Sequence, residues 1–336
     1  MSHQSIAIPW DHPDWLDESQ VWIQDNLDQL GLILNGAIEQ AHTRPWSTVL
    51  RVPTNEGNLF FKASAPSMIH EAGLTQALAS WRPDRLPKVL AADRQRSWLL
   101  LADGGRTLRS YLGSDQFLAH WRRILPLYAE MQIEMAGRRD DLLALGAMDR
   151  RLEMLPAKLE ALLTDQEALL IDQPDGLSAE QFRYLGIFVP RFAGLCAFLD
   201  SFGLPETLQH DDFHGNNIFV GEDGYLFFDW GETCVAHPFF TMVVTPRGIA
   251  YHMKLAEDAP ELAELRDIYL EPWRAGLDRR DLDLVYDLAN LVGRVNRALT
   301  WYRIVADLPE PYKSEEADAV PGWLLEFLEA QAESPF

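Results

Sequence analysis

The stretch LQHDDFHGNNIF at residues 208–219, together with FDWGE at residues 228–232, decides how this chain is interpreted. A polar loop leads into a short apolar run, a Gly-Glu-Asp-Gly turn and a second apolar run, which predicts a loop followed by a β-hairpin. Asn217 stands directly before the predicted hairpin and Asp229 directly after it. Because a hairpin folds its ends together, we expect Asp212 and Asp229 to converge although 229 minus 212, or 17, positions separate them.

The spacing of the polar residues in this stretch indicates phosphoryl-transfer chemistry. His210, Asp212 and Asn217 have the offsets of two and seven found in the kinase catalytic-loop pattern H-R-D-L-x-x-x-N, and Asp229-Trp230-Gly231 follows where kinases have D-F-G. Phosphoryl transfer needs positioning and charge neutralisation more than covalent participation. We interpret Asp212 as the base that orients the acceptor hydroxyl and takes its proton, and Asn217 and Asp229 as oxygen ligands of Mg²⁺. His210 is expected to brace the loop by hydrogen bonding.

A lysine and a glutamate upstream complete the set of residues that this chemistry requires. A kinase holds the phosphates with a strand lysine, which a glutamate on the following helix fixes in place. Lys62 lies in the apolar strand-like run LFFKA at residues 59–63, where a charge needs a reason to sit. Glu71 opens the next predicted helix and is the natural partner of Lys62. We interpret both residues as part of a nucleotide-binding site.

The segments 208–219 and 228–232 resemble those of the aminoglycoside-phosphotransferase and choline-kinase superfamily, and the resemblance extends from residues 51–53 through Lys62 and residues 98–101 to residue 238. It implies a protein-kinase-like fold that binds ATP or GTP with Mg²⁺ between two lobes and phosphorylates a hydroxyl of a small molecule. It also implies that the adenine or guanine ring of the nucleotide takes backbone hydrogen bonds near Leu101 and Asp103.

The chain departs from the superfamily at two places. The superfamily commonly has glycine where Asp211 stands, so two adjacent carboxylates compete for the role of base, and the spacing to Asn217 selects Asp212. No G-x-G-x-x-G precedes Lys62, so the segment at residues 42–47 is expected to cover the phosphates instead.

The order of predicted elements indicates an α+β chain with two lobes. A chain of 336 residues exceeds the usual size of a single core. We expect a small N-terminal lobe at residues 1–102, with an antiparallel sheet and helices at 15–34 and 70–81, and a larger, mainly helical lobe at residues 103–336. The strands of the small lobe are predicted at 47–53, 59–63, 88–91 and 98–101, and a hinge is predicted at 102–105. The helices of the larger lobe are predicted at 115–137, 150–163, 178–202, 261–276, 281–306 and 322–332.

Composition limits the partners and the compartment. The formal net charge of -22 repels phosphate backbones and anionic membranes, so we expect no nucleic acid and no membrane partner. Two distant cysteines, Cys196 and Cys234, do not predict a disulfide framework. Residues 1–15 lack the pattern of a signal peptide, and no apolar run reaches the length of a membrane helix, which predicts a cytoplasmic protein.

Three questions stay open at this level. A regulatory protein that binds nucleotide without catalysis would carry the same fold. His210, Asp211, Asp212 and His214 also suit a metal-dependent phosphohydrolase, although that site needs further ligands on helices. Aminoglycosides, macrolides, choline and sugars all remain candidate acceptors, and the oligomeric state is undetermined.

Overall fold

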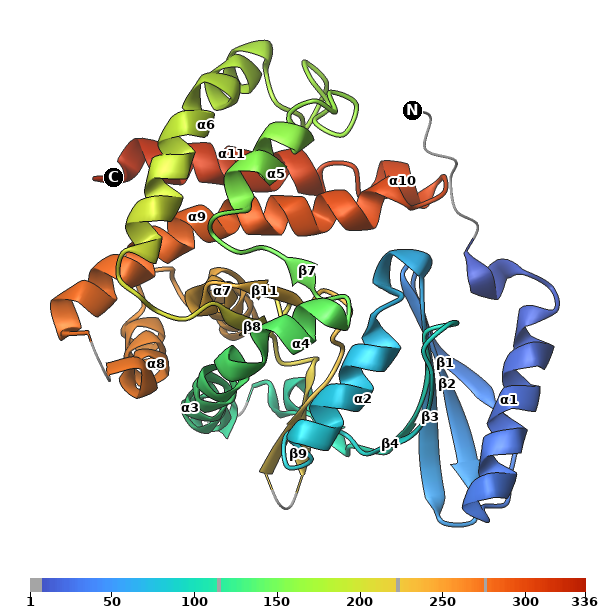
Figure 1. Cartoon of the computed structure of the whole chain (residues 1–336). Helices are drawn as coiled ribbons and strands as arrows, with labels where there is room; N and C mark the ends of the chain where they lie inside the picture. Colours follow the sequence, from blue (N-terminus) through green and yellow to red (C-terminus); the bar gives the residue numbers. More distant parts are fainter. Residues whose placement is uncertain (1–7, 114–115, 222–223, 275–276) are drawn as a thin grey trace. The chain divides into compact units, whose positions relative to one another are not determined.

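The protein is described by a computed structural model that covers residues 8–113, 116–221, 224–274 and 277–336 (Figure 1). Some predicted positions lie outside the described residues. They are residues 222–223 of the predicted turn, residue 115 of the helix predicted at 115–137, residues 275–276 of the helix predicted at 261–276, and residues 1–7. Contacts group the chain into two compact units. The first comprises Met1–Thr107, Asn217–Gly231 and Ala306–Ser314, and the second comprises Leu108–Asn216, Glu232–Val305 and Glu315–Phe336. The functional division predicted between residues 102 and 103 stays a prediction.

The first unit contains a five-stranded antiparallel sheet in the order β1-β2-β3-β5-β4. Its strands are β1 (Glu39–Thr43), β2 (Ser47–Thr54), β3 (Gly57–Ser64), β4 (Val89–Asp93) and β5 (Trp98–Ala102). The predicted hairpin at residues 47–63 is confirmed, with Val49 opposite Lys62. Strand β1 was not predicted; all of its residues are exposed, so it lacks the apolar alternation that marks a half-buried strand.

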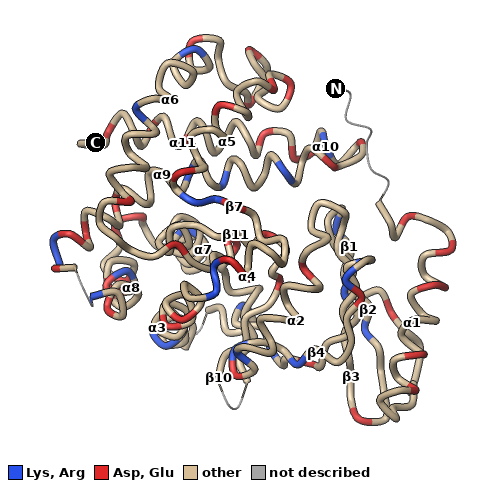
Figure 2. Tube along the Cα trace, in the orientation of Figure 1, with Lys and Arg blue, Asp and Glu red and all other residues tan. Residues whose placement is uncertain are grey.

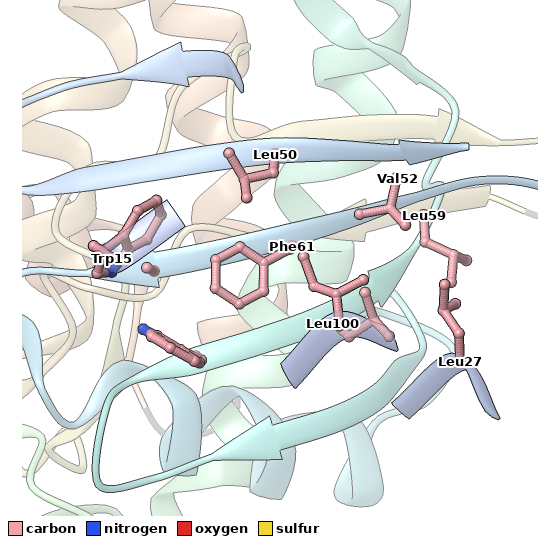
Figure 3. Close-up of a cluster of buried hydrophobic side chains, with 10 residues drawn as sticks. Trp15, Leu27, Leu50, Val52, Leu59, Phe61 and Leu100 are labelled. Atoms are coloured by element: carbon pink, nitrogen blue, oxygen red, sulfur yellow. The ribbon is translucent and has the colours of Figure 1, made fainter. Parts of the chain in front are cut away.

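Helix α1 (Trp15–Leu30) supplies the apolar partner for one face of this sheet (Figure 3). Trp15 and Leu27 belong to the same buried cluster as Leu50 of β2, Phe61 of β3 and Leu100 of β5. The helix ends at residue 30 and not at the predicted residue 34, because Gly31 takes a left-handed φ of 70° that stops the helix. Side chains alternate along a strand, so Lys62, next to Phe61, faces the opposite side of the sheet.

Helix α2 and a second small sheet complete the parts of this unit that position the candidate site. Helix α2 (Glu71–Trp81) follows the 3-10 turn Pro66–Met68. The second sheet has the order β10-β9-β6, from β6 (Arg106–Thr107), β9 (Ile218–Gly221) and β10 (Gly224–Phe227). The predicted hairpin after the polar loop is therefore confirmed. Gly104 lies so close to the ring of Phe219 that any side chain there would collide with it.

The second unit is mainly helical. It contains α3 (Gln116–Met135), α4 (Arg139–Ala144), α5 (Leu155–Leu162), α6 (Ala179–Asp200), α7 (Thr241–Met253), α8 (Pro260–Leu270), most of α9 (Arg279–Ala306) and α11 (Ala319–Glu333), while the short α10 (Tyr312–Glu315) spans a unit boundary. A small sheet in the order β7-β11-β8 joins Met148–Asp149, Cys234–Ala236 and Thr207–Gln209. The predicted helix at 150–163 begins only at Leu155.

Helix α7 was not predicted, although it supports the loop that carries Asp212. Pro246 and Gly248 lie inside it, and both residues disfavour a helix by propensity. Tertiary contacts override this preference, because the hydroxyl of Thr245 donates to the carbonyl of Phe213 at 2.7 Å. The helix is thereby attached to the segment that precedes Asn217.

Helix α6 is the one described helix that is long and apolar enough, by length and composition, to cross a membrane. Its buried stripe includes Phe188 and Phe192, which both pack against Phe327 of α11. The hydroxyl of Tyr184 donates to Gln331 at 2.9 Å. Core helices of soluble proteins pass the same test, so we interpret α6 as a packed helix of the second unit.

Candidate active site

Lys62, Glu71 and Asp229 form a compact ionic cluster within the first unit. Lys62 Nζ lies 2.5 Å from Glu71 Oε1 and 2.6 Å from Asp229 Oδ1, although 167 positions separate Lys62 from Asp229. The hydroxyl of Ser64 donates to the second oxygen of Glu71. Lys62 is 8% exposed and Glu71 is 1% exposed. The pairing of Lys62 with Glu71 is the one that the sequence suggested.

The charges in this cluster support one another. Burial lowers the pKa of Lys62, but the carboxylates of Asp229 and Glu71 outweigh it and hold that pKa well above its ordinary value. Burial also raises the pKa of Glu71, against the opposing effect of Lys62. Lys62 is therefore a fixed positive charge at neutral pH, held on the face of the sheet opposite α1.

The hairpin of β9 and β10 brings Asn217 and Asp229 to neighbouring positions. The N–H of Phe228 donates to the carbonyl of Asn217 at 3.1 Å, so Asn217 lies opposite the residue that precedes Asp229. Asp229 has a left-handed φ of 68°, which is unusual for a residue other than glycine and is concentrated at functional sites. These two residues, with Lys62 and Glu71, are thus four predicted site residues that the first unit brings together.

Gly231 allows the Asp-Trp-Gly segment to pass close to the glutamate. A Cβ at Gly231 would lie 2.6 Å from Met68 Sδ and 3.3 Å from Glu71 Oε2. Trp230 is fully buried, and its indole N–H donates to the carbonyl of Phe227 at 3.2 Å. The glycine is therefore required by a close approach, while the tryptophan anchors the segment.

The predicted base-binding residues Leu101 and Asp103 lie at the end of β5. Leu101 pairs with Phe60 on one side and with Val89 on the other. Asp103 follows the last paired residue of the strand, and its carboxylate accepts the N–H of Gly105 at 2.8 Å. The main chain at Asp103 is thus outside the sheet ladder, where an external hydrogen-bond partner can reach it.

Asp212 lies in the second unit with its neighbouring histidines. Asp212 Oδ2 is 3.2 Å from His214 Nε2, and His214 Nδ1 accepts the N–H of Asn216 at 3.2 Å. His210 is fully buried, its ring lies beside Phe213, and its main-chain N–H bonds to Tyr128 Oη at 3.0 Å. Burial alone would raise the pKa of Asp212, but His214, Arg297 and His210 hold it well below its ordinary value. Asp212 is therefore ionised at neutral pH.

The adjacent carboxylate, Asp211, is held by helix α9. Its carboxylate accepts Asn296 Nδ2 at 2.7 Å, Thr300 Oγ1 at 2.6 Å and Arg297 Nη1 at 3.2 Å. Arg297 Nη1 also donates to the main-chain carbonyl of Asp211 at 2.6 Å. Asp211 is 2% exposed and has a left-handed φ of 66°. It occupies a backbone position that favours glycine, and its charge is fully engaged.

Sequence reasoning missed Asn296, Arg297 and Thr300. One signal was available: Asn296 and Thr300 are four positions apart in a predicted helix and therefore lie on the same face of it. Both residues are buried, so each needs a hydrogen-bond partner inside the protein. Nothing in the local sequence connects them to Asp211, which precedes Asn296 by 85 positions. Their partner was therefore not predictable.

Glu232 and His237, which follow the Asp-Trp-Gly segment, both bond to groups of the second unit. Glu232 Oε2 lies 2.6 Å from Arg297 Nη1, and burial raises the pKa of Glu232 to about 8 against the opposing effect of Arg297. His237 is fully buried, and its Nδ1 accepts the N–H of Phe239 at 3.2 Å, so it caps the 3-10 turn Pro238–Phe240.

The donor set of Asn217 and Asp229 fits Mg²⁺. Amide and carboxylate oxygens are the hard ligands that this ion takes, and Mg²⁺ is commonly held by one or two protein groups together with substrate phosphates and water. Over the described ranges, no group of three or more His, Cys, Asp and Glu side chains is placed to hold a metal ion. With Asp211 bound by α9, the residues at 210–214 do not form the metal cluster of a phosphohydrolase.

Comparison with known proteins bears on the fold. No protein family matches the chain by sequence, and no curated protein matches it. A choline/ethanolamine kinase family protein from Mesorhizobium loti matches with a TM-score of 0.61 at 15% identity, covering 95% of this chain and 95% of that chain. The choline kinase from Streptococcus pneumoniae matches with a TM-score of 0.60 at 12% identity, covering 94% and 100%.

A macrolide 2'-phosphotransferase type I also matches, with a TM-score of 0.53 at 13% identity over 90% of this chain and 96% of that chain. The resemblance that residues 208–219 and 228–232 suggested is thus confirmed at the level of the fold. This chain has the kinase-like α+β fold of choline/ethanolamine kinases and of aminoglycoside and macrolide phosphotransferases.

Proposed function

We propose that this chain is a small-molecule kinase that transfers the terminal phosphoryl group of ATP or GTP, with Mg²⁺, to an alcohol. The observation that carries the proposal is the position of Lys62 Nζ, within 2.6 Å of carboxylate oxygens of both Glu71 and Asp229. A buried lysine fixed by a helix glutamate, next to the aspartate of an Asp-Trp-Gly segment, is the arrangement that holds nucleotide phosphates in kinases.

In this proposal the residues of the first unit bind the nucleotide. Lys62 contacts the phosphates, Glu71 fixes the lysine, and main-chain groups near Leu101 and Asp103 bind the base. Asn217 and Asp229 hold Mg²⁺, which neutralises the charge that develops on the transferred phosphoryl group. The segment at residues 42–47, which includes the end of β1 and the connection to β2, covers the phosphates.

Asp212 serves as the base that acts on the acceptor. Its carboxylate orients the acceptor hydroxyl; the hydroxyl oxygen forms a bond to the terminal phosphorus while the bond from phosphorus to the leaving nucleotide oxygen breaks. The proton passes to Asp212 and the nucleoside diphosphate leaves. A depressed pKa makes Asp212 a weak base, which suffices because a loose transition state releases the proton late. His214 and His210 hold the loop in the required position.

The substitution Asp212→Asn tests the role of the base. We expect turnover to fall by about 10²-fold or more, because the amide cannot accept the proton, while the affinity for Mg-ATP stays within about threefold. Release of ADP from Mg-ATP is measured across a panel of hydroxylated small molecules, with nucleotide binding followed by calorimetry. Unchanged turnover in the variant would remove Asp212 from the mechanism.

The same assay separates the proposal from its main alternative, a nucleotide-binding regulatory protein. A competent kinase site releases ADP slowly by transfer to water even without an acceptor, and Asp212→Asn should reduce that rate. A protein that binds Mg-ATP tightly but releases no ADP, with or without the panel, is better described as a nucleotide sensor.

Localisation in the cytoplasm and the absence of nucleic-acid and membrane partners are parts of the same proposal.

A further inference from the structure

A pocket of about 430 Å³ lies wholly within the second unit, walled by three helices. Its lining includes Arg247, Gly248 and Tyr251 from one face of α7, Arg297 and Trp301 from α9, and Trp323 from α11. The volume is that of a small-molecule site, and aromatic walls with a few polar groups are the usual lining of such sites. None of the described lining residues is acidic.

The pocket lies beside the loop that carries Asp212. Gly248 packs against His214, whose Cβ is 3.8 Å from the position of a Cβ on that glycine, and His214 contacts Asp212. On the α9 side, the charge of Arg297 acts on Asp212 directly. A molecule in this pocket is therefore adjacent to the residue that we propose as the base.

The cation-binding positions of the pocket are already taken by the chain's own arginines. The guanidinium carbon of Arg247 lies 5.0 Å from the centroid of the Trp323 ring, and that of Arg297 lies 5.8 Å from it. The carboxylates that pair with these arginines, Glu326 with Arg247 and Glu232 and Asp211 with Arg297, are each engaged by a guanidinium group. Two guanidinium groups thus occupy the ring positions where an ammonium group would bind, which disfavours choline-like and aminoglycoside acceptors at this place.

Arg297 also has unused hydrogen-bonding capacity. Its bonds to Asp211 and Glu232 all use Nη1. Its Nε is buried and has no hydrogen-bond partner among the described residues, and the residue as a whole is only 4% exposed. The Nε–Nη2 edge of a guanidinium presents two parallel N–H groups, which match the two oxygens of a carboxylate or a phosphate.

We propose that this pocket binds an acceptor that carries an anionic group, a carboxylate or a phosphate, on a flat apolar scaffold, with Arg297 and Arg247 as anion-binding residues and Trp301 and Trp323 against the scaffold. This inference rests on the proposed kinase function only where it says that a hydroxyl group of the bound acceptor is phosphorylated. Binding itself is tested without nucleotide, so the two proposals fail separately.

Three probes of one shape and different charge test the proposal: 4-(hydroxymethyl)benzoate, 4-(hydroxymethyl)benzamide and 4-(hydroxymethyl)benzylamine. Calorimetry on the full chain without nucleotide measures their affinities. We expect the benzoate to bind about tenfold or more tightly than the benzamide, because charge-assisted hydrogen bonds replace neutral ones, and the benzylamine to bind most weakly. Equal or tighter binding of the benzylamine, or no saturable binding of the benzoate, overturns the proposal.

Arg247→Gln locates the effect, with Arg122→Gln as its matched control. Both arginines are partly exposed and pair with a glutamate, Arg247 with Glu326 and Arg122 with Glu264, so neither change disturbs the core. We expect Arg247→Gln to weaken the benzoate about tenfold and to leave the benzamide within twofold, whereas Arg122→Gln alters neither. Equal losses for benzoate and benzamide would contradict anion recognition.

Addition of Mg-ATP then separates this inference from the kinase proposal. ADP release stimulated by the benzoate but not by the benzylamine supports both. Tight binding of the benzoate without any ADP release leaves the anion site in place and argues against the kinase. ADP release stimulated only by the benzylamine supports the kinase and overturns the anion site.

Discussion

At the scale of single residues, the two adjacent carboxylates of the loop at residues 210–214 have different environments. Asp211 is buried with a left-handed φ of 66° and is bound by three side chains of α9. Asp212 is partly exposed and contacts His214. Aspartate tolerates the left-handed region better than most residues, and its charge is compensated by Arg297. The ambiguity that the sequence left between the two residues is thereby reduced to one candidate base.

Thr300→Val tests whether the contact of α9 with Asp211 positions the loop. Valine keeps the shape of threonine but removes the donor to a buried carboxylate, so we expect a loss of about 1–3 kcal/mol in the free energy of unfolding. We also expect turnover to fall severalfold with little change in the affinity for ATP. Urea denaturation and ADP-release kinetics measure these two effects.

Thr300→Ser is the control for that substitution, because serine retains the hydroxyl. It should stay close to the unsubstituted protein in both measurements. If valine and serine at this position have the same stability, the hydrogen bond to Asp211 contributes nothing, and the interpretation of α9 as a support for the loop is wrong.

At the scale of elements, short segments carry the site residues and longer helices hold them. The hairpin of β9 and β10 places Asn217 and Asp229 together, and β3 with α2 places Lys62 and Glu71 together. Helices α7 and α9 each bond to the loop at residues 210–213, through Thr245 and through Asn296 with its neighbours. The 3-10 turn Pro238–Phe240 then leads into α7 and depends on His237 as its cap.

His237 makes this turn sensitive to acid. Burial lowers the pKa of His237 from 6.5 to about 3, so the folded protein keeps this histidine neutral while the unfolded chain binds a proton below pH 6.5. The stability that this group contributes is therefore present above pH 6.5 and is lost as the pH falls toward 3. Each pH unit within that window costs about 1.4 kcal/mol.

His237→Asn removes this dependence while it keeps a side chain that can accept the N–H of the turn. We expect the unsubstituted protein to lose about 2 kcal/mol more than the variant between pH 7.5 and pH 5.0, as measured by urea denaturation at both values. A parallel loss of stability in the two proteins would show that His237 is not the group that titrates.

At the scale of the whole molecule, the acidic composition is distributed over the elements. Figure 2 shows acidic residues on helices of both units, including α1 and α3. The described lining of the pocket, by contrast, includes two arginines and no acidic residue, in a chain with a formal net charge of -22. The charge of the molecule and the charge of its candidate acceptor site therefore favour different partners.

The net charge predicts that the protein does not bind nucleic acid. Phosphate backbones are bound through lysine and arginine with release of counterions, and an excess of carboxylates opposes this. We expect no mobility shift of a short DNA duplex at about 10 µM protein in roughly 50 mM salt. A shift that weakens as salt is added would contradict the prediction and would indicate a basic surface.

Most of the elements were predictable from the sequence because their signals are local. Alternating apolar residues marked β2 and β3, and helical spacing marked α1, α3, α6, α9 and α11. Several of the elements that were missed have weak local signals: β1 is entirely exposed, β6, β7, β8 and β11 have two or three residues, α4 has six, and α7 contains a proline and a glycine. Contacts with distant segments stabilise these elements.

The candidate site divides in the same way. The identities and spacing of His210, Asp212, Asn217 and Asp229 predict phosphoryl-transfer chemistry from the sequence alone, because a loop followed by a hairpin fixes their order within one short segment. The support of Asp211 by Asn296 and Thr300, and the pocket between α7, α9 and α11, were decided only by the tertiary structure. Asp211 and Asn296, 85 positions apart, come together through helix packing, and packing leaves no trace in local periodicity.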